Sequence, residues 1–152
     1  MSAGWLGEEY QGKVTSISEN PDLSRVKELI ISAHGGSQDR DGNPILRFPG
    51  GEAMTADQFA RQLRKLGYAG DVTLVVCSAG AVVKDPQGHE RSFANDLANA
   101  MNSQITAWPH DVTVADPDLP GPAVQANGWP FGLLSTDRRI YRPGGPIAGE
   151  SP

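Results

Sequence analysis

Two short apolar runs constrain the fold of this chain more than any other feature. They cover residues 29–33, which read Leu-Ile-Ile-Ser-Ala, and residues 72–76, which read Val-Thr-Leu-Val-Val. Continuous runs of this length and composition are typical of strands that are buried on both faces, as in parallel sheets. A third run, Gln-Ile-Thr-Ala-Trp, occupies residues 104–108. We therefore expect three strands at the centre of one sheet.

Amphipathic segments separate these runs. Thr55 stands at an N-cap position, and the apolar residues that follow it at helical spacing predict a helix over residues 56–66. Ser92 can cap a second helix that continues to residue 102. Strands and helices that alternate in this way favour parallel pairing through right-handed crossovers. The expected class is α/β, a three-layer arrangement with a mainly parallel sheet and helices on both faces.

The rest of the chain is less regular. Residues 13–18 alternate as an edge strand does, and the glycine-rich residues 35–51 are expected to form a loop closed by a small hairpin. We expect residues 131–135 and 139–142 to pair as a C-terminal hairpin, and the chain from Pro143 onward to be a loose tail. Residues 1–152 are predicted to form a single domain in which residues 1–20 and 143–152 are peripheral.

Length and charge limit the classes of partner. A chain of 152 residues is long enough to bury a self-supporting core. Its formal charge is −5 and its 13 Lys and Arg form no run, so we expect no nucleic-acid partner. No window approaches the ~18 apolar residues that span a bilayer, and the N-terminus does not read as a signal peptide, so we expect no membrane insertion.

A histidine and the chain's one cysteine directly follow the first two apolar runs. His34 precedes Gly35 and Gly36, and Cys77 precedes Ser78. Catalytic groups collect at the carboxyl ends of strands in open α/β sheets. A thiolate can attack a carbonyl carbon, an imidazole can protonate the leaving amine, and backbone N–H groups can stabilise the oxyanion.

We therefore interpret Cys77 as a nucleophile and His34 as its general acid. The backbone N–H groups of Gly35 or Gly36 and of Cys77 are candidates for the oxyanion hole. Ser78 is a further candidate for the oxyanion or substrate-binding site.

The same segments resemble the caspase-like cysteine peptidases, in which one apolar strand ends in His-Gly and a later one ends in the catalytic Cys. His34 precedes Cys77 by 43 residues, close to the roughly 50 of caspases. The nearest likeness is to the self-processing peptidase domains and effector domains of large bacterial toxins, where a Ser-Phe-Ala-x-x-Leu-Ala helix follows the Cys strand. Residues 92–98 here read Ser-Phe-Ala-Asn-Asp-Leu-Ala, and the likeness covers residues 29–107.

This resemblance implies a three-layer caspase-like sandwich, a His34/Cys77 dyad and hydrolysis of peptide bonds. It also implies a secreted protein, or a part of a larger toxin that is delivered into a target cell. The substrate would be a protein or peptide, and an immunity or inhibitor protein would be a further partner. Members that inositol phosphate activates bind it through many basic side chains, whereas the bases here are scattered, so we expect no cofactor.

Other interpretations remain open. Free cysteines are commonly buried for structural reasons. The same two residues would also serve another thiol-dependent hydrolase or transferase, such as a deamidase, or remain as a vestige in a non-catalytic binding module. His89 and His110 are expected to be solvated loop residues.

We expect no metal site. The three histidines are dispersed and lack the HExxH spacing of a zinc site. Residues 39–43 resemble the start of a calcium loop, but Gly50 stands where the loop needs its closing glutamate, so a solvated turn is expected. Trp108 and Trp129 are expected to pack in the core or against a hairpin.

Overall fold

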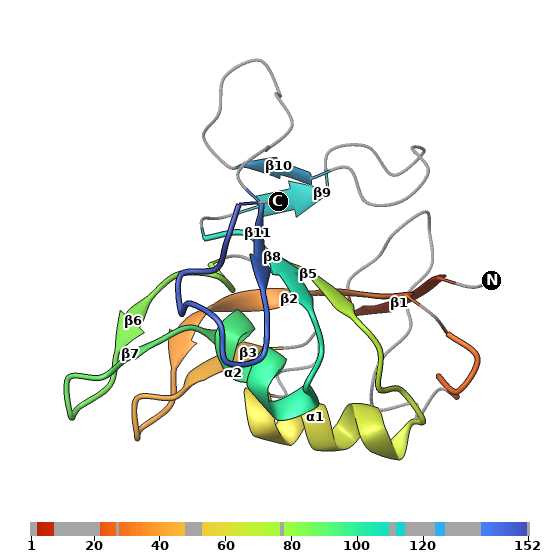
Figure 1. The fold of residues 1–152 in the computed structure, drawn as a ribbon, viewed down its shortest axis with the longest axis horizontal. Coiled ribbons are helices and arrows are strands. Elements are labelled where there is room, and N and C mark those ends of the chain that lie inside the picture. The colour runs from red at the N-terminus through yellow and green to blue at the C-terminus, as the bar shows by residue number, and fades with distance from the viewer. Residues whose placement is uncertain are drawn as a thin grey trace.

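A mixed sheet of seven strands forms the centre of the molecule (Figure 1). The computed structural model describes residues 3–7, 22–26, 28–47, 53–76, 78–109, 112–114, 124–126 and 138–151. Neighbouring strands follow the order β11 (Arg139–Tyr141), β8 (Ile105–Ala107), β5 (Val72–Val76), β2 (Glu28–Gln38), β3 (Pro44–Arg47) and β4 (Ala53–Thr55). β1 (Ala3–Gly7) pairs with the first part of β2.

The central strands β1, β2, β5 and β8 run parallel to one another, whereas β3, β4 and β11 are antiparallel to their neighbours. β2 and β5 pair in register from Leu29 opposite Val72 to Ala33 opposite Val76. The α/β class and the three central strands that the apolar runs predict are confirmed.

Both predicted helices are present, as α1 (Ala56–Lys65) and α2 (Phe93–Met101). Thr55 and Gln58 form a reciprocal capping box in which each side chain accepts a hydrogen bond from the other's backbone N–H. Ser92 caps α2 by accepting a hydrogen bond from the backbone N–H of Asn95. Local capping signals therefore locate the start of each helix correctly.

The two helices pack against each other and against the same face of the sheet (Figure 1). The rings of Phe59 and Phe93 join them, with centroids 6.5 Å apart. Both helices in the described part of the chain cover this one face, so helices on both faces stay a prediction. Ile30 and Val75 on the opposite face are only 5% and 4% exposed. β2 and β5 are thus buried on both faces, which explains their continuous apolar sequence.

The expectation of a loop over residues 35–51 is wrong for its first part. β2 continues through His34 to Gln38, and the chain then turns and returns as β3. A register shift between His34 and Ser37 accommodates the continuation. The predicted small hairpin is present, but it is an extension of the central strand. Residues 13–18 lie outside the described residues.

Short strands elsewhere were missed because they carry little sequence signal. A second hairpin consists of β6 (Val83–Lys84) and β7 (Glu90–Arg91), and β9 (Val112–Val114) pairs with β10 (Val124–Ala126). β11 pairs with β8, a partner that sequence patterning did not predict. Its predicted hairpin partner, residues 131–135, lies outside the described residues.

The chain after Pro143 is not a loose tail. Ile140 and Glu150 exchange two backbone hydrogen bonds of 2.8 Å. The Ser92 hydroxyl, which is fully buried, donates to the carbonyl oxygen of Ile147 at 2.9 Å. The amide of Asn95 donates to the carbonyl oxygen of Gly145 at 3.3 Å. These contacts attach the segment to the first turn of α2, a partner that no local sequence signal could indicate.

No helix in the described ranges is long and apolar enough to cross a membrane.

Ser92→Ala tests this attachment, with Thr55→Ala as the matched control that loses a cap alone. We expect Thr55→Ala to lower the free energy of unfolding by about 1 kcal/mol. Ser92→Ala should cost about 1 kcal/mol more, because the carbonyl of Ile147 also loses its donor. Urea denaturation measures both values. Equal losses would show that the C-terminal contact contributes nothing to stability.

Candidate functional site

His34 stands where β2 changes its neighbour. Up to Ser32, β2 pairs with β1 on one edge, and up to Ala33 it pairs with β5 on the other. From His34, opposite Arg47, it pairs with β3. His34 is therefore the first residue of β2 beyond its parallel pairing, and open α/β sheets place ligands at the carboxyl ends of their parallel strands.

Four of the five predicted site residues are described. The His34 side chain is exposed, Gly35 and Ser78 are partly buried, and Gly36 is exposed. Gly36 and Ser78 approach closely, since a Cβ atom built on Gly36 would lie 3.8 Å from Ser78 Cβ. Cys77 lies outside the described residues. The structure therefore brings the glycines after His34 next to the residue that follows Cys77.

Two residues of this site have left-handed backbone conformations. Gly36 has φ +84°, a region that glycine adopts without strain. Ser78 has φ +56°, which is uncommon for a residue with a side chain. Conformations of this kind concentrate at functional sites. The chain thus leaves β5 through a strained turn that sequence reading did not anticipate.

A cavity of about 190 Å³ opens beside this turn. None of the described residues that line it has an ionisable side chain. They are Gly35, Gly36, Ser37, Pro44, Ile45, Leu46, Ser78, Ala79, Ala81, Val83 and Phe93. The cavity is therefore suited to an apolar group of modest size.

The turn at the tip of the β2–β3 hairpin depends on one carboxylate. Asp39 Oδ1 accepts hydrogen bonds of 2.9 Å from the backbone N–H groups of Asp41 and Asn43, and Asp39 Oδ2 accepts one of 3.1 Å from the Asn43 amide. Hydrogen bonds from Asn43 hold the pKa of Asp39 below its usual value. The turn predicted for residues 39–43 is confirmed, and Arg40 and Asp41 are exposed as expected, whereas Gly42 is buried.

The other candidate ligands are dispersed. His89 is exposed at the tip of the β6–β7 hairpin, with its Nδ1 3.5 Å from Asp85 Oδ2, and His110 lies outside the described residues. Trp108 is buried, as expected, whereas Trp129 is outside the described ranges. Within the part of the chain that the structure describes, no three His, Cys, Asp or Glu residues come together.

Sequence reading missed a polar cluster of Arg91, Asp96 and Asn43. The Arg91 guanidinium donates to Asp96 Oδ2 at 2.7 Å through Nη2 and to Asn43 Oδ1 at 2.8 Å through Nη1. Its hydrogen bond to Asp96 raises the pKa of Arg91, and burial raises the pKa of Asp96 against the opposing effect of Arg91. The cluster lines a cavity of about 360 Å³. No motif indicated it, because Asn43 and Arg91 are distant in sequence.

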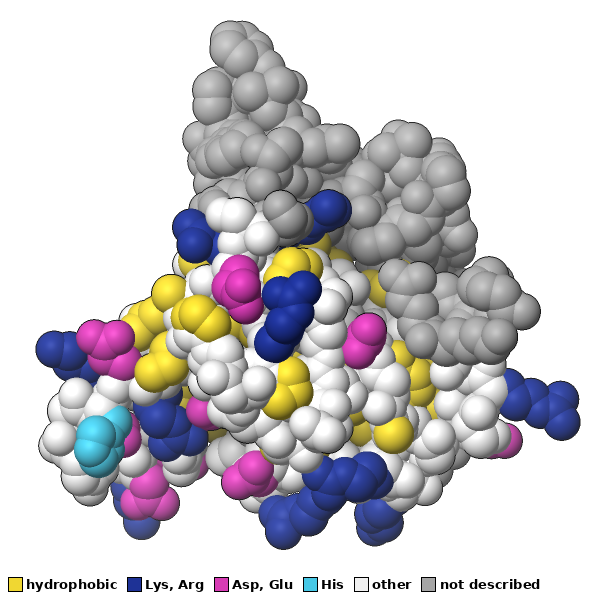
Figure 2. Space-filling view, viewed as in Figure 1, with side chains coloured by type: hydrophobic (Ala, Val, Ile, Leu, Met, Phe, Trp, Pro, Cys, Tyr) yellow, Lys and Arg dark blue, Asp and Glu magenta, His cyan; other side chains and the backbone are white. Residues whose placement is uncertain are grey.

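The visible surface mixes acidic and basic side chains (Figure 2). Hydrophobic side chains gather on the left of that view, near the hairpin of β6 and β7. Val82, 41% exposed, immediately precedes β6. The segment between Ser78 and β6 thus carries an apolar residue on the surface and apolar residues in the small cavity.

One family model, Domain of unknown function (DUF8616), matches residues 8–126. No curated protein and no solved structure shows significant similarity to the chain.

Asp39→Ala tests the hairpin tip that borders the site. Because the pKa of Asp39 is lowered in the folded state, its carboxylate stabilises the fold above the unfolded pKa, and this contribution is lost as the pH falls through the folded pKa. We therefore expect a lower melting temperature for the variant near neutral pH and a difference that shrinks below about pH 4.

The neighbouring exposed Asp41, replaced by alanine, is the control, since no hydrogen bond to its carboxylate is recorded among the described residues. A difference for Asp39→Ala that persisted unchanged at low pH would contradict the role of the charge.

Proposed function

We propose that this chain, which belongs to the family Domain of unknown function (DUF8616), is a cysteine endopeptidase with a caspase-like fold and a Cys77/His34 dyad. The observation that carries the proposal is the register of β2 and β5, in which Ala33 lies opposite Val76. His34 and Cys77 directly follow Ala33 and Val76 in the sequence. Neighbouring strands are about 4.8 Å apart, a separation that suits a nucleophile and its acid–base partner.

The proposed fold is a three-layer sandwich with helices on both faces of the sheet. The packing of α1 and α2 supplies one outer layer. The burial of Ile30 and Val75 supports a second layer, because a face open to solvent would leave both side chains exposed.

In the proposed reaction, the Cys77 thiolate attacks the carbonyl carbon of the scissile peptide and forms a tetrahedral oxyanion. The C–N bond then breaks, the leaving amine takes a proton from the His34 imidazolium, and an acyl-enzyme thioester remains. Water, deprotonated by the now neutral His34, adds to the thioester carbon. The thiolate leaves, and the acid product is released.

The left-handed turn at Ser78 and the glycines after His34 support the oxyanion assignment. Gly36 lies against Ser78 with no Cβ atom between them, so a substrate carbonyl can approach the backbone there. Backbone N–H groups in this region, those of Gly35 or Gly36 and of Cys77, would donate to the oxyanion.

The small cavity supports a preference for an uncharged substrate side chain. The described residues of its lining carry no ionisable group, so a charged side chain would lose its hydration without gaining a partner among them. We assign the substrate as a protein or peptide with an apolar residue near the scissile bond.

The biological setting is also part of the proposal. The likeness of residues 29–107 to toxin peptidase and effector domains supports secretion, or delivery into a target cell as part of a larger toxin. An immunity or inhibitor protein fits that setting. The formal charge of −5 supports a protein substrate over nucleic acid.

Comparison of wild-type, Cys77→Ala and His34→Ala proteins in a cell lysate tests the function. We expect new peptide N-termini with wild-type protein, mapped by mass spectrometry, and a loss of at least about a hundredfold in cleavage rate for each variant. His89→Ala is the matched control, since this histidine is exposed at a hairpin tip, and it should cleave at the wild-type rate.

The outcomes of this experiment distinguish peptide hydrolysis from side-chain chemistry and from the absence of any reaction at Cys77. Cuts that depend on Cys77 and share an apolar residue before the break support the peptidase. Cys77-dependent mass changes without chain cleavage would replace it with side-chain chemistry such as deamidation. Identical products from wild-type and Cys77→Ala proteins would overturn any catalytic role of the thiol.

A further inference from the structure

The two hairpins that continue from the proposed dyad lie side by side (Figure 1). Gln38, at the end of β2, donates from Nε2 to the carbonyl oxygen of Gly42 at 2.9 Å and to that of Lys84 at 3.1 Å. Gly42 packs so closely on the other hairpin that an added Cβ atom would collide with the ring of Pro86. The β2–β3 and β6–β7 hairpins are therefore in direct contact.

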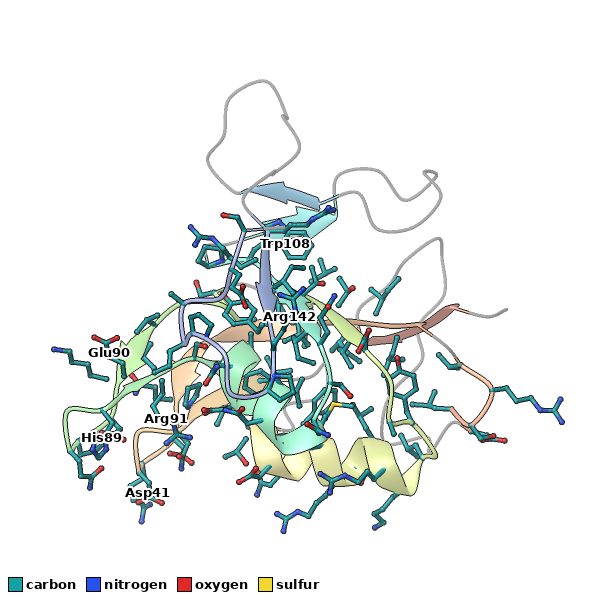
Figure 3. The ribbon with its side chains drawn as sticks, in the orientation of Figure 1. Asp41, His89, Glu90, Arg91, Trp108 and Arg142 are labelled. Carbon is teal, nitrogen blue, oxygen red and sulfur yellow. The ribbon has the colours of Figure 1, made fainter. Side chains whose placement is uncertain are left out.

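Arg91 holds this pair of hairpins to α2. It stands at the end of β7, and Figure 3 shows its side chain between the β6–β7 hairpin and the helices. Its Nη1 donates to Asn43, next to β3, while Nε and Nη2 donate to Asp96 on α2. One side chain thus links three elements, namely β7, which carries it, the β2–β3 hairpin and α2.

This arrangement requires arginine. The planar guanidinium presents several donors in fixed directions, so Arg91 can bind the carboxylate of Asp96 and the amide oxygen of Asn43 together. A lysine keeps the charge and can pair with Asp96, but its side chain is shorter and ends in one nitrogen in place of three, so it cannot keep the contacts of Nε and Nη2 with Asp96 and that of Nη1 with Asn43 in the same geometry.

The segments that Arg91 joins are those that form the proposed site. β2 runs without a break from His34 to Gln38, and residues 78–83 connect the end of β5 to β6. Gly36 and Val83, one from each segment, face the same small cavity. A shift of one hairpin relative to the other would therefore change the distance between Gly36 and Ser78.

We infer that Arg91 is a positioning residue for the proposed reaction: by joining Asn43 and Asp96, it sets the relative position of the chain segments that follow His34 and Cys77. This inference rests on the proposed function. Arg91 touches no reacting atom and acts through the two hairpins. Misplacement of reacting groups by about 1 Å can cost a hundredfold in rate.

Arg91→Lys is the test variant, and Arg142→Lys is the matched control. Arg142 also pairs with a carboxylate, at 3.4 Å from Glu150, but lies apart from the hairpins, near the C-terminus. We expect Arg91→Lys to lower kcat by about tenfold to a hundredfold and to slow alkylation of Cys77 by iodoacetamide, with a small change in KM. Arg142→Lys should match the wild type in all three. Unchanged kcat and alkylation in Arg91→Lys, even with a lower melting temperature, would overturn the inference.

A second variant keeps the inference testable if Arg91→Lys does not fold. It also tests whether Arg91 acts through its contact with Asn43. Asn43→Ala removes the contact between Arg91 and the β2–β3 hairpin and leaves Asp96 paired. It also removes the amide donor to Asp39 Oδ2, a loss that Asp39→Ala reports separately. If Arg91 acts through its contact with Asn43, Asn43→Ala combined with Arg91→Lys should slow the reaction by less than the two single effects multiplied together, because both changes remove the same link. Fully additive losses would contradict that route.

The failure of the proposed function can be distinguished from the failure of this inference. Backbone amide chemical shifts of Gly36 and Ser78, measured by NMR, require no catalysis. They should move in Arg91→Lys and stay in place in Arg142→Lys. If they move while wild-type protein shows no Cys77-dependent reaction, the positioning role survives and the peptidase does not. If they stay in place in Arg91→Lys, the positioning role fails.

Discussion

The parallel pairing of β2 with β5 is the contact on which the rest of the structure depends. Its hydrogen-bonded register sets Ala33 opposite Val76, and its apolar side chains anchor both helices through one core. Burial on both faces makes a slip of register costly, because a shift by one residue would exchange the two faces of the strand. The same constraint that stabilises the fold therefore aligns the strand positions before His34 and Cys77.

β2 takes part in both the parallel sheet and a hairpin because it is longer than its neighbours. Its first half lies within the parallel sheet, and its second half leaves β1 and β5 behind and forms a hairpin with β3. Gly36, with its positive φ, lies within the register shift where this change occurs. The protein thus uses one strand both as the centre of its core and as one wall of the small cavity. The chain at and after the left-handed turn at Ser78 forms the other wall.

Sequence patterns predicted an element correctly where the interactions that form it lie close together in the sequence. The capping of α1 by Thr55 and of α2 by Ser92 spans one helical turn, and the buried strands carry their own apolar signal. Patterns failed where the partner is far along the chain. Arg91 meets Asn43 across 48 residues, and Ser92 meets Ile147 across 55. Because a polar side chain can bond to any nearby donor or acceptor, only the folded chain determines which partner it finds.

The division between apolar and polar contacts follows the distance from the core. Between the helices and the sheet, burial of apolar side chains such as Phe59 and Leu74 holds the elements in place. The two hairpins extend beyond that core, and their tips, with residues such as Asp41 and His89, face water. Directed hydrogen bonds take over this role, because they fix orientation as well as distance. Under the proposed function, the segments after His34 and Cys77 would need both, since catalysis depends on the angle of approach as much as on proximity.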